Sequence, residues 1–450
     1  MSAKTEMDML HGPLKKKILL FALPIAATSI LQQLFNAVDI AVVGRFVGSV
    51  ALAAVGTNAP IIALFVNGIV NLSIGATVSI THLIGLGKRE RIQDVIHSVM
   101  FFAVFAGLLL AFIGVGIAKP LLTALNTPDT VLDEAVLYLR IYFLGLPFIA
   151  AYNFLSAIIR SVGDSRRPLL VLLSSGLLNV VLNLTLVLGL HRGVDGVAIA
   201  TVISNIFSAG VMWILMMREE GELKLHPHLL HWDWSIMKKV FAIGGPASLQ
   251  SMFFCLSNIC IQSAINSLGA TIVAAAAATQ NYLNISFYMV TGFNQAIIAF
   301  TGQNYGAGQY DRCRKVMKIG WGECVLVILC MVAVFILGRY PLLSLFTSDG
   351  EVLKHAATYM MITEIPYFLV VSYENIGAYL RAINHSLCPA IVAVLCTVVL
   401  RILYIYLVFS HFKTFAGLMM VYPISWIICV LLMFSAFLYF DGQERKKWKS

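Results

Sequence analysis

The sequence predicts an all-α membrane protein in which twelve transmembrane helices form two pseudo-symmetric six-helix lobes around a central cleft. Three observations predict this fold class. Of the 450 residues, 59% are hydrophobic and only 12% are charged, which is too apolar for a water-soluble domain. The hydrophobic residues fall into long stretches, and the second half of the chain repeats landmarks of the first half.

The apolar stretches define the expected helices. A helix needs roughly 20 apolar residues to cross the hydrocarbon core of a bilayer. Twelve stretches meet this requirement, at 16–43, 51–82, 93–118, 131–157, 168–190, 194–217, 238–265, 272–302, 314–338, 352–378, 388–410 and 415–440. The second and eighth are long and rich in Asn, Gln and Gly, so their ends are the least sharply defined.

An internal duplication divides the chain. Its landmarks recur at an offset of 221 or 222 residues. They include Gly48 with Gly269, Pro24 with Pro246, Asn36 with Asn258, Gly87 with Gly308, Arg91 with Arg312, Arg160 with Arg381 and Pro168 with Pro389. We therefore expect an N-lobe at 1–218, a cytoplasmic linker at 219–234 and a C-lobe at 235–450. Membrane transporters often build a cleft between two such copies, so transport is the first hypothesis.

The basic residues indicate orientation. Most Lys and Arg residues outside the stretches fall on the side of the N-terminus, as in Lys15 to Lys17 and Arg445 to Lys447. The opposite connectors hold only Arg45, Lys119, Arg192, Arg339, Lys354 and Lys413. This asymmetry predicts that both termini are cytoplasmic and that the protein is a multi-pass protein of the cell (inner) membrane. Because the cations are spread over many short loops, the excess of 31 basic over 22 acidic residues does not indicate nucleic-acid binding.

Cysteines and histidines give little sign of a cofactor or metal site. The 8 cysteines form no CxxC pair and mostly lie inside expected helices, where a small apolar thiol packs well. The linker histidines His226, His228 and His231 lack an acidic or thiol partner at ligand spacing. We expect no cofactor, and no metal beyond a sodium ion that serves as a coupling ion.

Asp39 is the most informative polar residue, because an ionisable group inside the bilayer costs roughly 2.5 to 3.5 kcal/mol on insertion scales. It lies in the outer half of the first stretch, with Asn36 three residues earlier on the same face. A structural interpretation would have Asp39 cap the second helix or pair with Arg45 or Arg140. The functional interpretation is a proton or sodium site.

Depth along the helices, at about 1.5 Å per residue, supplies candidate neighbours for Asp39. Asn179 and Asn183 are one turn apart in the fifth stretch, and Thr201 lies at a similar depth in the sixth. One carboxylate with two amide oxygens and a hydroxyl would suit a hard cation, whereas the carboxylate alone suffices for a proton. The expected coupling ion is thus H⁺ or Na⁺.

The second half lacks this acid, because the position equivalent to Asp39 is Cys260 or Ile261. Its ionisable residues lie elsewhere. Glu364 in the tenth stretch and Arg401 in the eleventh reach comparable depths, and we expect them to form a buried ion pair, which is more often structural than functional. Glu374 lies closer to the cytoplasmic surface.

Four segments resemble motifs of the multidrug and toxic compound extrusion (MATE) family: 38–56, 158–170, 193–204 and 300–312. The resemblance covers essentially the whole chain. It implies two six-helix lobes around a central cleft, alternating access, and export of organic cations in exchange for H⁺ or Na⁺. Because the internal duplication already supplies two lobes, we expect a monomer to suffice, and because no catalytic constellation is apparent, we do not expect an enzyme.

Carried over residue by residue, the resemblance places Asp39 on the acidic position of the family's first helix, Asn179 on the Asn of its fifth and Thr201 on a Thr of its sixth. Two departures matter. Asn183 stands where the family often has Asp, and Cys255 lies near the position of a Glu in one sodium-driven branch. Coupling through Asp39 is therefore favoured, with a proton somewhat preferred to sodium.

Amides and aromatic residues of the first, second, seventh and eighth stretches are the candidates for the cleft wall. They are Gln33, Asn67, Gln250, Met252, Asn258, Gln280, Asn281, Tyr282, Asn284 and Tyr288. Aromatic faces attract cations and Met adapts to varied shapes, so the expected partners are small organic cations. Alternatively, several of these residues simply join helix to helix.

Two other functions remain open. A flippase for lipids or lipid-linked oligosaccharides would need cationic residues in the cleft, but most cations of this chain lie in loops. An intramembrane enzyme, the more remote alternative, would need a convergent His, Ser or acidic pair, and only scattered histidines such as His82, His97 and His385 occur.

Overall fold

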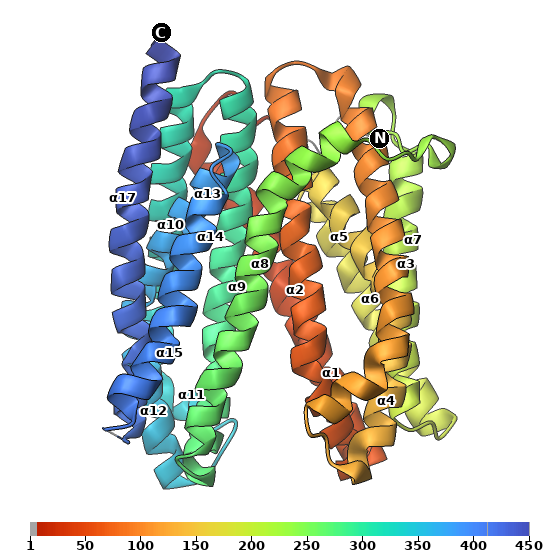
Figure 1. Ribbon diagram of the computed structural model, residues 1–450, viewed down its shortest axis with the longest axis vertical. Helices are drawn as coiled ribbons and strands as arrows, with labels where there is room; N and C mark the ends of the chain where they lie inside the picture. The colour runs from red at the N-terminus through yellow and green to blue at the C-terminus, as the bar shows by residue number, and fades with distance from the viewer. Residues whose placement is uncertain (1–6, 412, 450) are drawn as a thin grey trace. The chain divides into compact units, whose positions relative to one another are not determined.

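The computed structural model describes residues 7–411 and 413–449, and in these residues it contains helices and no strand (Figure 1). The helices of the first half are α1 (Leu14–Val42), α2 (Ser49–Gly85), α3 (Ile92–Ala124), α4 (Asp129–Leu144), α5 (Leu146–Ser161), α6 (Arg166–Leu184) and α7 (Val194–Met217). Those of the second half are α8 (Trp234–Asn266), α9 (Ala270–Gly306), α10 (Tyr310–Leu337), α11 (Arg339–Leu343), α12 (Gly350–Glu364), α13 (Phe368–Ala382), α14 (Leu387–Val394), α15 (Leu400–Tyr404), α16 (Phe415–Met419) and α17 (Val421–Lys449).

The helices form two compact units. Unit 1 contains Ala27–Ser248 and, from the N-terminal segment, Met7. Unit 2 contains Asp8–Ala26 and the chain from Leu249 onward. Within unit 1, α3 packs on α4 and α5, and within unit 2, α9 packs on α10, α12 and α13 (Figure 1).

Two helices change unit along their length. In α1, the residues up to Ala26 belong to unit 2 and the rest to unit 1, and this boundary lies two residues after Pro24. In α8, the residues up to Ser248 belong to unit 1 and the rest to unit 2, and this boundary lies two residues after Pro246. A proline removes one backbone hydrogen bond and weakens the helix at that point. The duplicated sequence therefore places a local break at corresponding points of both helices.

Glycine residues allow the first part of α8 to pack closely on α2 in unit 1, and the first part of α1 to pack closely on α9 in unit 2. A Cβ atom on Gly75 of α2 would lie 2.1 Å from the carbonyl oxygen of Val240 in α8. In unit 2, a Cβ atom on Gly292 of α9 would lie 2.7 Å from the carbonyl oxygen of Ala22 in α1. Helices in lipid associate through such close contacts. Glycine at both positions explains why the first part of α8 belongs to unit 1 and the first part of α1 to unit 2.

A polar clamp also recurs in both units. In unit 1 the buried Nδ2 of Asn58 donates to the carbonyl of Ala54 in its own helix (3.0 Å) and to that of Ala135 in α4 (2.9 Å). In unit 2 Thr279 lies 3.1 Å from the carbonyl oxygens of both Ala275 and Ala356, in α9 and α12. The duplication has thus kept the cross-helix hydrogen bond although the side chain differs.

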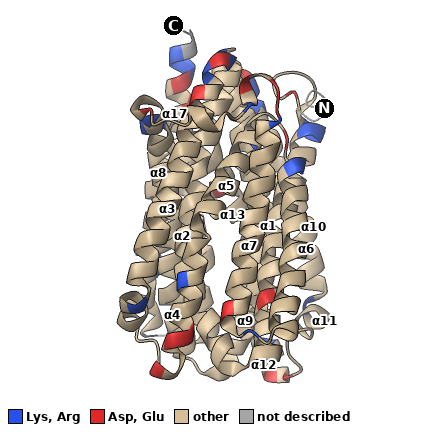
Figure 2. Cartoon of the chain, turned by 90° about the vertical axis from the view of Figure 1, so that its right-hand side faces the viewer, with Lys and Arg blue, Asp and Glu red and all other residues tan. Residues whose placement is uncertain are grey.

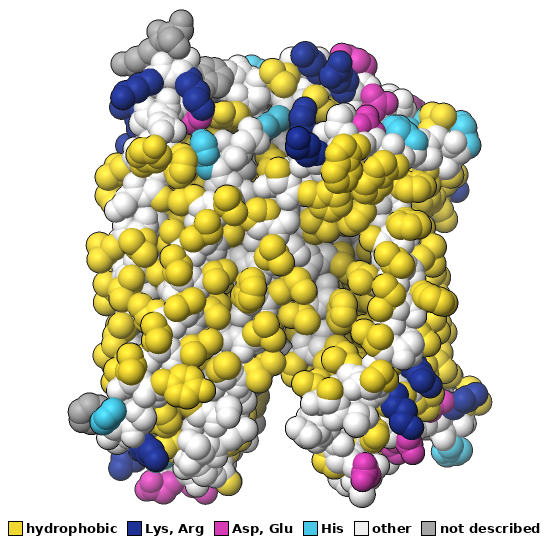
Figure 3. Space-filling view, in the orientation of Figure 1, with side chains coloured by type: hydrophobic (Ala, Val, Ile, Leu, Met, Phe, Trp, Pro, Cys, Tyr) yellow, Lys and Arg dark blue, Asp and Glu magenta, His cyan; other side chains and the backbone are white. Residues whose placement is uncertain are grey.

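The outer surfaces of the helices suit a bilayer. In the described part of the chain ten helices are long and apolar enough to cross a membrane, and α4 with α5, bent by 43°, forms an eleventh candidate. Large apolar side chains stay exposed on them, such as Phe112 (83%) and Leu337 (84%) (Figure 3). Charged residues gather mainly toward the helix ends (Figure 2). These features confirm the predicted all-α membrane fold.

The tenth predicted stretch differs from a simple span. Over 352–378 the structure has α12 and α13, each of 15 residues, joined by a 3-10 turn at Ile365–Tyr367. Pro366 in this turn cannot donate a backbone hydrogen bond, which explains the break. Each piece is shorter than the roughly 20 residues of a full crossing, so length and composition support up to eleven spans where the sequence predicted twelve.

Candidate functional site

Asp39 lies inside unit 1, on α1. Its side chain is 7% exposed although the helix around it has an apolar outer surface. One turn later α1 widens into a π-helical turn, Val43–Val47, which ends at Gly48. Single π-helical turns inside helices are rare and often occur at functional sites.

The neighbouring helix α6 repeats this construction. Asn179 and Asn183 face the interior of unit 1 with 6% and 0% exposure, and α6 also ends in a π-helical turn, Thr185–Gly189. The two π-helical turns contact each other, and α6 packs along α7, which carries Thr201. Three helices therefore converge on the carboxylate of Asp39.

The hydrogen bonds join the predicted residues into one cluster. Asn183 donates from Nδ2 to Oδ1 of Asp39 and to Oδ1 of Asn179, the latter at 3.1 Å. The hydroxyl of Thr201 lies 3.4 Å from Oδ2 of Asp39 and 3.0 Å from the carbonyl of Val197, and it accepts from Nδ2 of Asn179 at 3.5 Å. The structure thus brings together four of the five predicted coupling residues.

Asn36, the fifth predicted coupling residue, lies outside this cluster. It is exposed on α1, and no hydrogen bond in the described structure joins it to Asp39. Residues three apart on a helix differ by about 60° in direction, so they share a face only loosely. Asp39 turns toward α6 and α7, whereas Asn36 stays at the edge of the packed face.

No cation balances Asp39 within the described residues, where none of the ion pairs includes it. The guanidinium of Arg45 lies over the ring of Phe46 at 5.9 Å, and Arg140 donates to the carbonyl of Val115 at 3.2 Å. The structural interpretation in which Asp39 pairs with Arg45 or Arg140 is therefore wrong. Burial without a counter-ion makes the charged carboxylate costly, which is the condition for a group that exchanges an ion.

Sequence reasoning missed two tyrosines of this site. Tyr138 and Tyr142 of α4 stack at 6.2 Å and lie within electrostatic range of Asp39. Both are two positions away from Arg140, and two residues correspond to about 200° of turn on a helix. Tyr138 is buried and Arg140 is exposed, so Arg140 lies on the outer face of α4. The i, i+4 spacing of the two tyrosines was the signal that could have found them.

The second half contains no equivalent acid, as the sequence predicts, and Ile261 at this position is buried at 2% exposure. The predicted ion pair between Glu364 and Arg401 is not formed. Glu364 accepts hydrogen bonds from the hydroxyl of Ser286 at 3.0 and 3.3 Å. The prediction used depth alone, and depth does not determine the direction in which a side chain points around its helix.

Arg401 has other partners. Its Nε donates to the hydroxyl of Ser425 at 3.2 Å, and its guanidinium lies 4.7 Å from the ring of Tyr422 and 5.7 Å from the ring of Phe254. Nη1 is buried without a hydrogen-bond partner. Cation–π contacts thus partly replace the expected carboxylate. Glu374, the other acid of this unit, accepts from Nδ2 of Asn294 at 3.2 Å.

The predicted cleft residues differ in how much surface they offer within their own unit. The exposed ones are Asn67, Asn258, Gln280 and Asn281, and the half-buried ones are Gln33, Gln250, Met252, Asn284 and Tyr288. Gln250 accepts a hydrogen bond of 2.8 Å from Arg381. Tyr282 is 6% exposed, donates to the carbonyl of Leu342 at 2.7 Å and packs on Phe335, so it offers almost no surface to a ligand.

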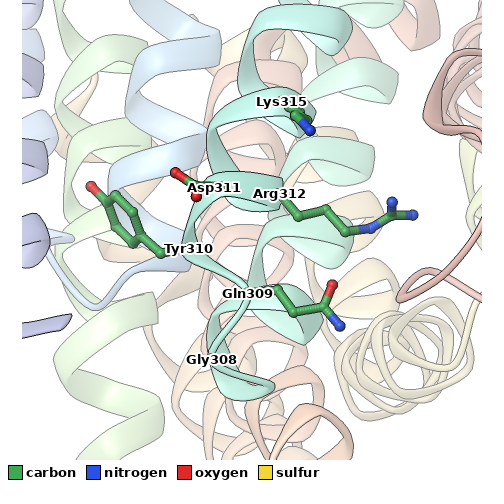
Figure 4. A pocket seen from close by; sticks show the side chains of 6 residues that line it. All are labelled: Gly308, Gln309, Tyr310, Asp311, Arg312 and Lys315. Atoms are coloured by element: carbon green, nitrogen blue, oxygen red, sulfur yellow. The ribbon is translucent and has the colours of Figure 1, made fainter. Parts of the chain in front are cut away.

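The motif at 300–312 has a structural role in unit 2. A pocket of about 280 Å³ lies where α9 turns into α10, and its lining residues are Gly308, Gln309, Tyr310, Asp311, Arg312 and Lys315 (Figure 4). Arg312 donates to the carbonyl of Gly12 at 3.0 Å, and Asn304 donates to that of Met9 at 3.1 Å. These bonds hold the segment from Met9 to Gly12 on unit 2.

Comparison with known proteins agrees with the sequence. The MatE family model matches residues 24–185 and 246–407, once in each half. The probable multidrug resistance protein YoeA of Bacillus subtilis is 27% identical over 440 residues, which are 95% of this chain and 94% of YoeA. The probable multidrug resistance protein NorM of Thermotoga maritima is 25% identical over 388 residues, 84% of this chain and 82% of NorM.

A solved structure has the same fold. An outward-facing multidrug resistance MATE family transporter of the MOP superfamily superposes with a TM-score of 0.92, over 99% of this chain and 100% of that chain, at 19% sequence identity. The resemblance noted in the sequence and the prediction of a transporter instead of an enzyme are therefore confirmed. With both halves matched by the family model, the chain belongs to the MatE family of multi-pass membrane transporters.

Proposed function

We propose that this protein is a secondary antiporter that exports small organic cations in exchange for protons, with sodium as the alternative ion, and that Asp39 carries the coupling ion. One observation supports this most directly: the carboxylate of Asp39 is 7% exposed inside a membrane-embedded unit and has no cationic partner among the described residues. An ion that binds there offsets the cost of the buried charge.

The neighbouring amides suit an exchange of ions. In the present arrangement Asn183 presents an N–H to the carboxylate, which suits a charged Asp39. A proton on Oδ1 of Asp39, or a sodium ion in contact with that oxygen, is better matched by an oxygen in place of that N–H. Oδ1 of Asn183 is buried without a partner, and a half turn of the amide would point it at Asp39. The absence of a second carboxylate favours the proton.

Coupling requires that the charged and neutral states of Asp39 prefer different conformations, because a ligand shifts an equilibrium only by its differential affinity. We propose that the halves 1–218 and 235–450 act as the two lobes, joined by 219–234, and that cation cargo binds between them against the amide and aromatic residues named above. Each charge moved through the membrane potential contributes about 2.3 kcal/mol per 100 mV. Cargo and coupling ion then exclude each other in one of the two states.

Orientation and assembly complete the proposal. The asymmetric Lys and Arg residues favour cytoplasmic termini in the cell membrane. Because the duplication already supplies both lobes, we propose that a monomer is sufficient for transport.

Reconstitution into vesicles tests the proposal. Purified protein is placed in vesicles that contain a fluorescent organic cation, and either a pH gradient or a sodium gradient is imposed. Movement of the cation with the pH gradient alone supports proton coupling, and movement with the sodium gradient alone assigns sodium. If no cation moves under either gradient while a labelled lipid crosses the bilayer, the antiporter proposal is wrong and the flippase alternative is supported.

A further inference from the structure

Two exposed tryptophans end the connector between the halves. Trp232 and Trp234 are 43% and 61% exposed, and their rings stack with centroids 5.9 Å apart. Indole rings have a large apolar face and one N–H donor, and in membrane proteins they concentrate at the level of the lipid headgroups. Neither tryptophan is part of the site around Asp39.

The connector holds these tryptophans in place. His226 donates its backbone N–H to Nε2 of His97 on α3 at 3.0 Å, and Leu225 donates to the carbonyl of Met216 at 3.0 Å. The side chains of Leu223 and Leu225 are buried at 8% and 1% exposure. The exposure of the tryptophans is therefore a property of an anchored segment and does not come from a frayed loop.

An aromatic path connects the tryptophans to the outer surface of α3. The ring of Trp232 lies 6.5 Å from Phe101 and 6.3 Å from Phe102, and Phe101 stacks on Phe105 at 6.1 Å. Phe105 is 55% exposed and begins the apolar stripe that continues with Leu108, Leu109 and Phe112. α3 belongs to the helices able to cross a membrane. The surface of the connector is thus continuous with the apolar outer surface of α3.

Exposed cations surround the upper end of this path. Lys238 follows Trp234 by four residues on α8 and so shares its face, and Lys239 is also exposed. The exposed cations at this end of unit 1 include Lys88, Arg89, Arg91, Arg166, Arg218, Lys224, Lys238 and Lys239, and the exposed acids include Glu90, Asp94 and Glu220. A Lys or Arg near an anionic membrane surface contributes about 1 kcal/mol of binding.

We propose that Trp232 and Trp234, together with Lys238 and Lys239, form a docking surface that seats the connector in the anionic headgroup layer of the bilayer. The indole rings lie at the level where the apolar stripe of α3 ends, and the lysines reach lipid phosphates beyond it. The occupant of this surface is lipid and not a second protein, because the surface continues the lipid-facing side of α3.

Hydrogen–deuterium exchange on the full-length protein tests this proposal. The purified protein is placed in nanodiscs of phosphatidylcholine alone or of phosphatidylcholine mixed with phosphatidylglycerol. We expect amides of the connector and of the first two turns of α8 to exchange several-fold more slowly in the anionic discs. Equal exchange in both lipids would overturn the proposal. The same scaffold protein encloses both kinds of disc, so a difference in exchange between them comes from the lipid.

Two double variants separate this surface from a general effect of charge. Lys238→Gln with Lys239→Gln should remove most of the difference between the two lipids. The matched control, Lys15→Gln with Lys16→Gln, changes two exposed lysines at the start of α1 and should leave the difference intact. If both double variants reduce it equally, the effect is non-specific and the proposal is wrong. Unchanged exchange in α2 shows that each variant is folded.

Discussion

Asn183 donates an N–H to the carboxylate of Asp39 while Oδ1 of the same amide stays buried without a hydrogen-bond partner. A buried polar atom without a partner costs about 1 to 3 kcal/mol. The site therefore carries an unsatisfied acceptor beside a carboxylate that has no counter-ion. Both features would be relieved when Asp39 gains a proton or a cation, and this links the pair to the coupling step.

Replacement of Asp39 by Asn should abolish transport and leave the fold intact. Asn has nearly the same shape but neither titrates nor carries charge, so an ion gradient can no longer act through it. Because a buried charge is removed, we expect a midpoint of thermal unfolding in detergent equal to or above that of the wild type. Cation efflux from vesicles is the measurement. Asp133→Asn, at an exposed acid of α4, should transport normally, and efflux by both variants would remove Asp39 from the mechanism.

Replacement of Asn183 by Asp should add sodium dependence. The second carboxylate would lie directly beside Asp39, and two close carboxylates favour either a shared proton or a bound cation. We expect sodium to raise the unfolding temperature of this variant more than that of the wild type. Asn153→Asp, in a half-buried position of α5, is the control. An identical response of both variants to sodium would contradict this role of Asn183.

Gly176 controls how closely α6 approaches α1. A Cβ atom at this position would lie 1.8 Å from the ring of Phe35, which is one turn before Asp39. Gly176→Ala should therefore push the helices apart, with about 1 to 3 kcal/mol of lost stability and reduced transport. The double variant with Phe35→Leu should recover both, whereas Gly189→Ala, where no atom lies within 4 Å, should have little effect. Failure of the double variant to recover would show that the contact is not the cause.

Glu364 and Arg401 should behave as independent residues. Because Glu364 bonds Ser286 and Arg401 bonds Ser425, the stability changes of Glu364→Gln and Arg401→Met should add within about 0.5 kcal/mol in a double-mutant cycle. Breaking a buried ion pair by removing one partner would cost about 3 to 5 kcal/mol. A large coupling energy between the two substitutions would therefore support the ion pair between Glu364 and Arg401 that the sequence predicted.

The sequence alone predicted the residues that lie around Asp39 better than the partner of Arg401, and the reason is geometric. Depth along a helix follows from counting residues, and the 3.6-residue period shows which neighbours on the same helix share a face. Asn179 and Asn183 are one turn apart on the same face of α6, so a correct prediction that one of them lies near Asp39 also places the other there. For Glu364 and Arg401 only depth was known, and their direction depends on the packing of α12 and α15, which no local pattern encodes.

Packing also explains two further differences between the predicted and the observed structure: the neighbours of Asp39 and the break between α12 and α13. The choice of Arg140 as a neighbour of Asp39 rested on its charge, whereas the structure turns Tyr138 and Tyr142 inward. The broken stretch of α12 and α13 contains a visible signal, Pro366, but a proline inside an apolar stretch also occurs in continuous helices such as α2 with Pro60. Local sequence therefore predicted the elements and left their contacts open.

The connector should respond to pH through His97. Nε2 of His97 accepts the backbone N–H of His226, which requires a neutral ring with its proton on Nδ1. Acidification puts a proton on Nε2 and removes a bond of about 1 kcal/mol. The rings of His226 and His231 lie 6.1 and 6.5 Å from the ring of His97, and Asp94 on α3 interacts electrostatically with His97. The ring of His228 lies 5.6 Å from that of His226.

Amide exchange of the connector should therefore accelerate as the pH falls from about 7.5 to about 5, which extends below the range in which histidines ordinarily titrate, and by more than the intrinsic change measured on an unfolded peptide. His97→Gln keeps an acceptor near the position of Nε2 but does not titrate, so most of the pH effect should disappear. His97→Leu should exchange rapidly at both pH values, because no acceptor remains. An equal pH response in the wild type and in His97→Gln would assign the effect to the linker histidines and exclude His97 as its origin.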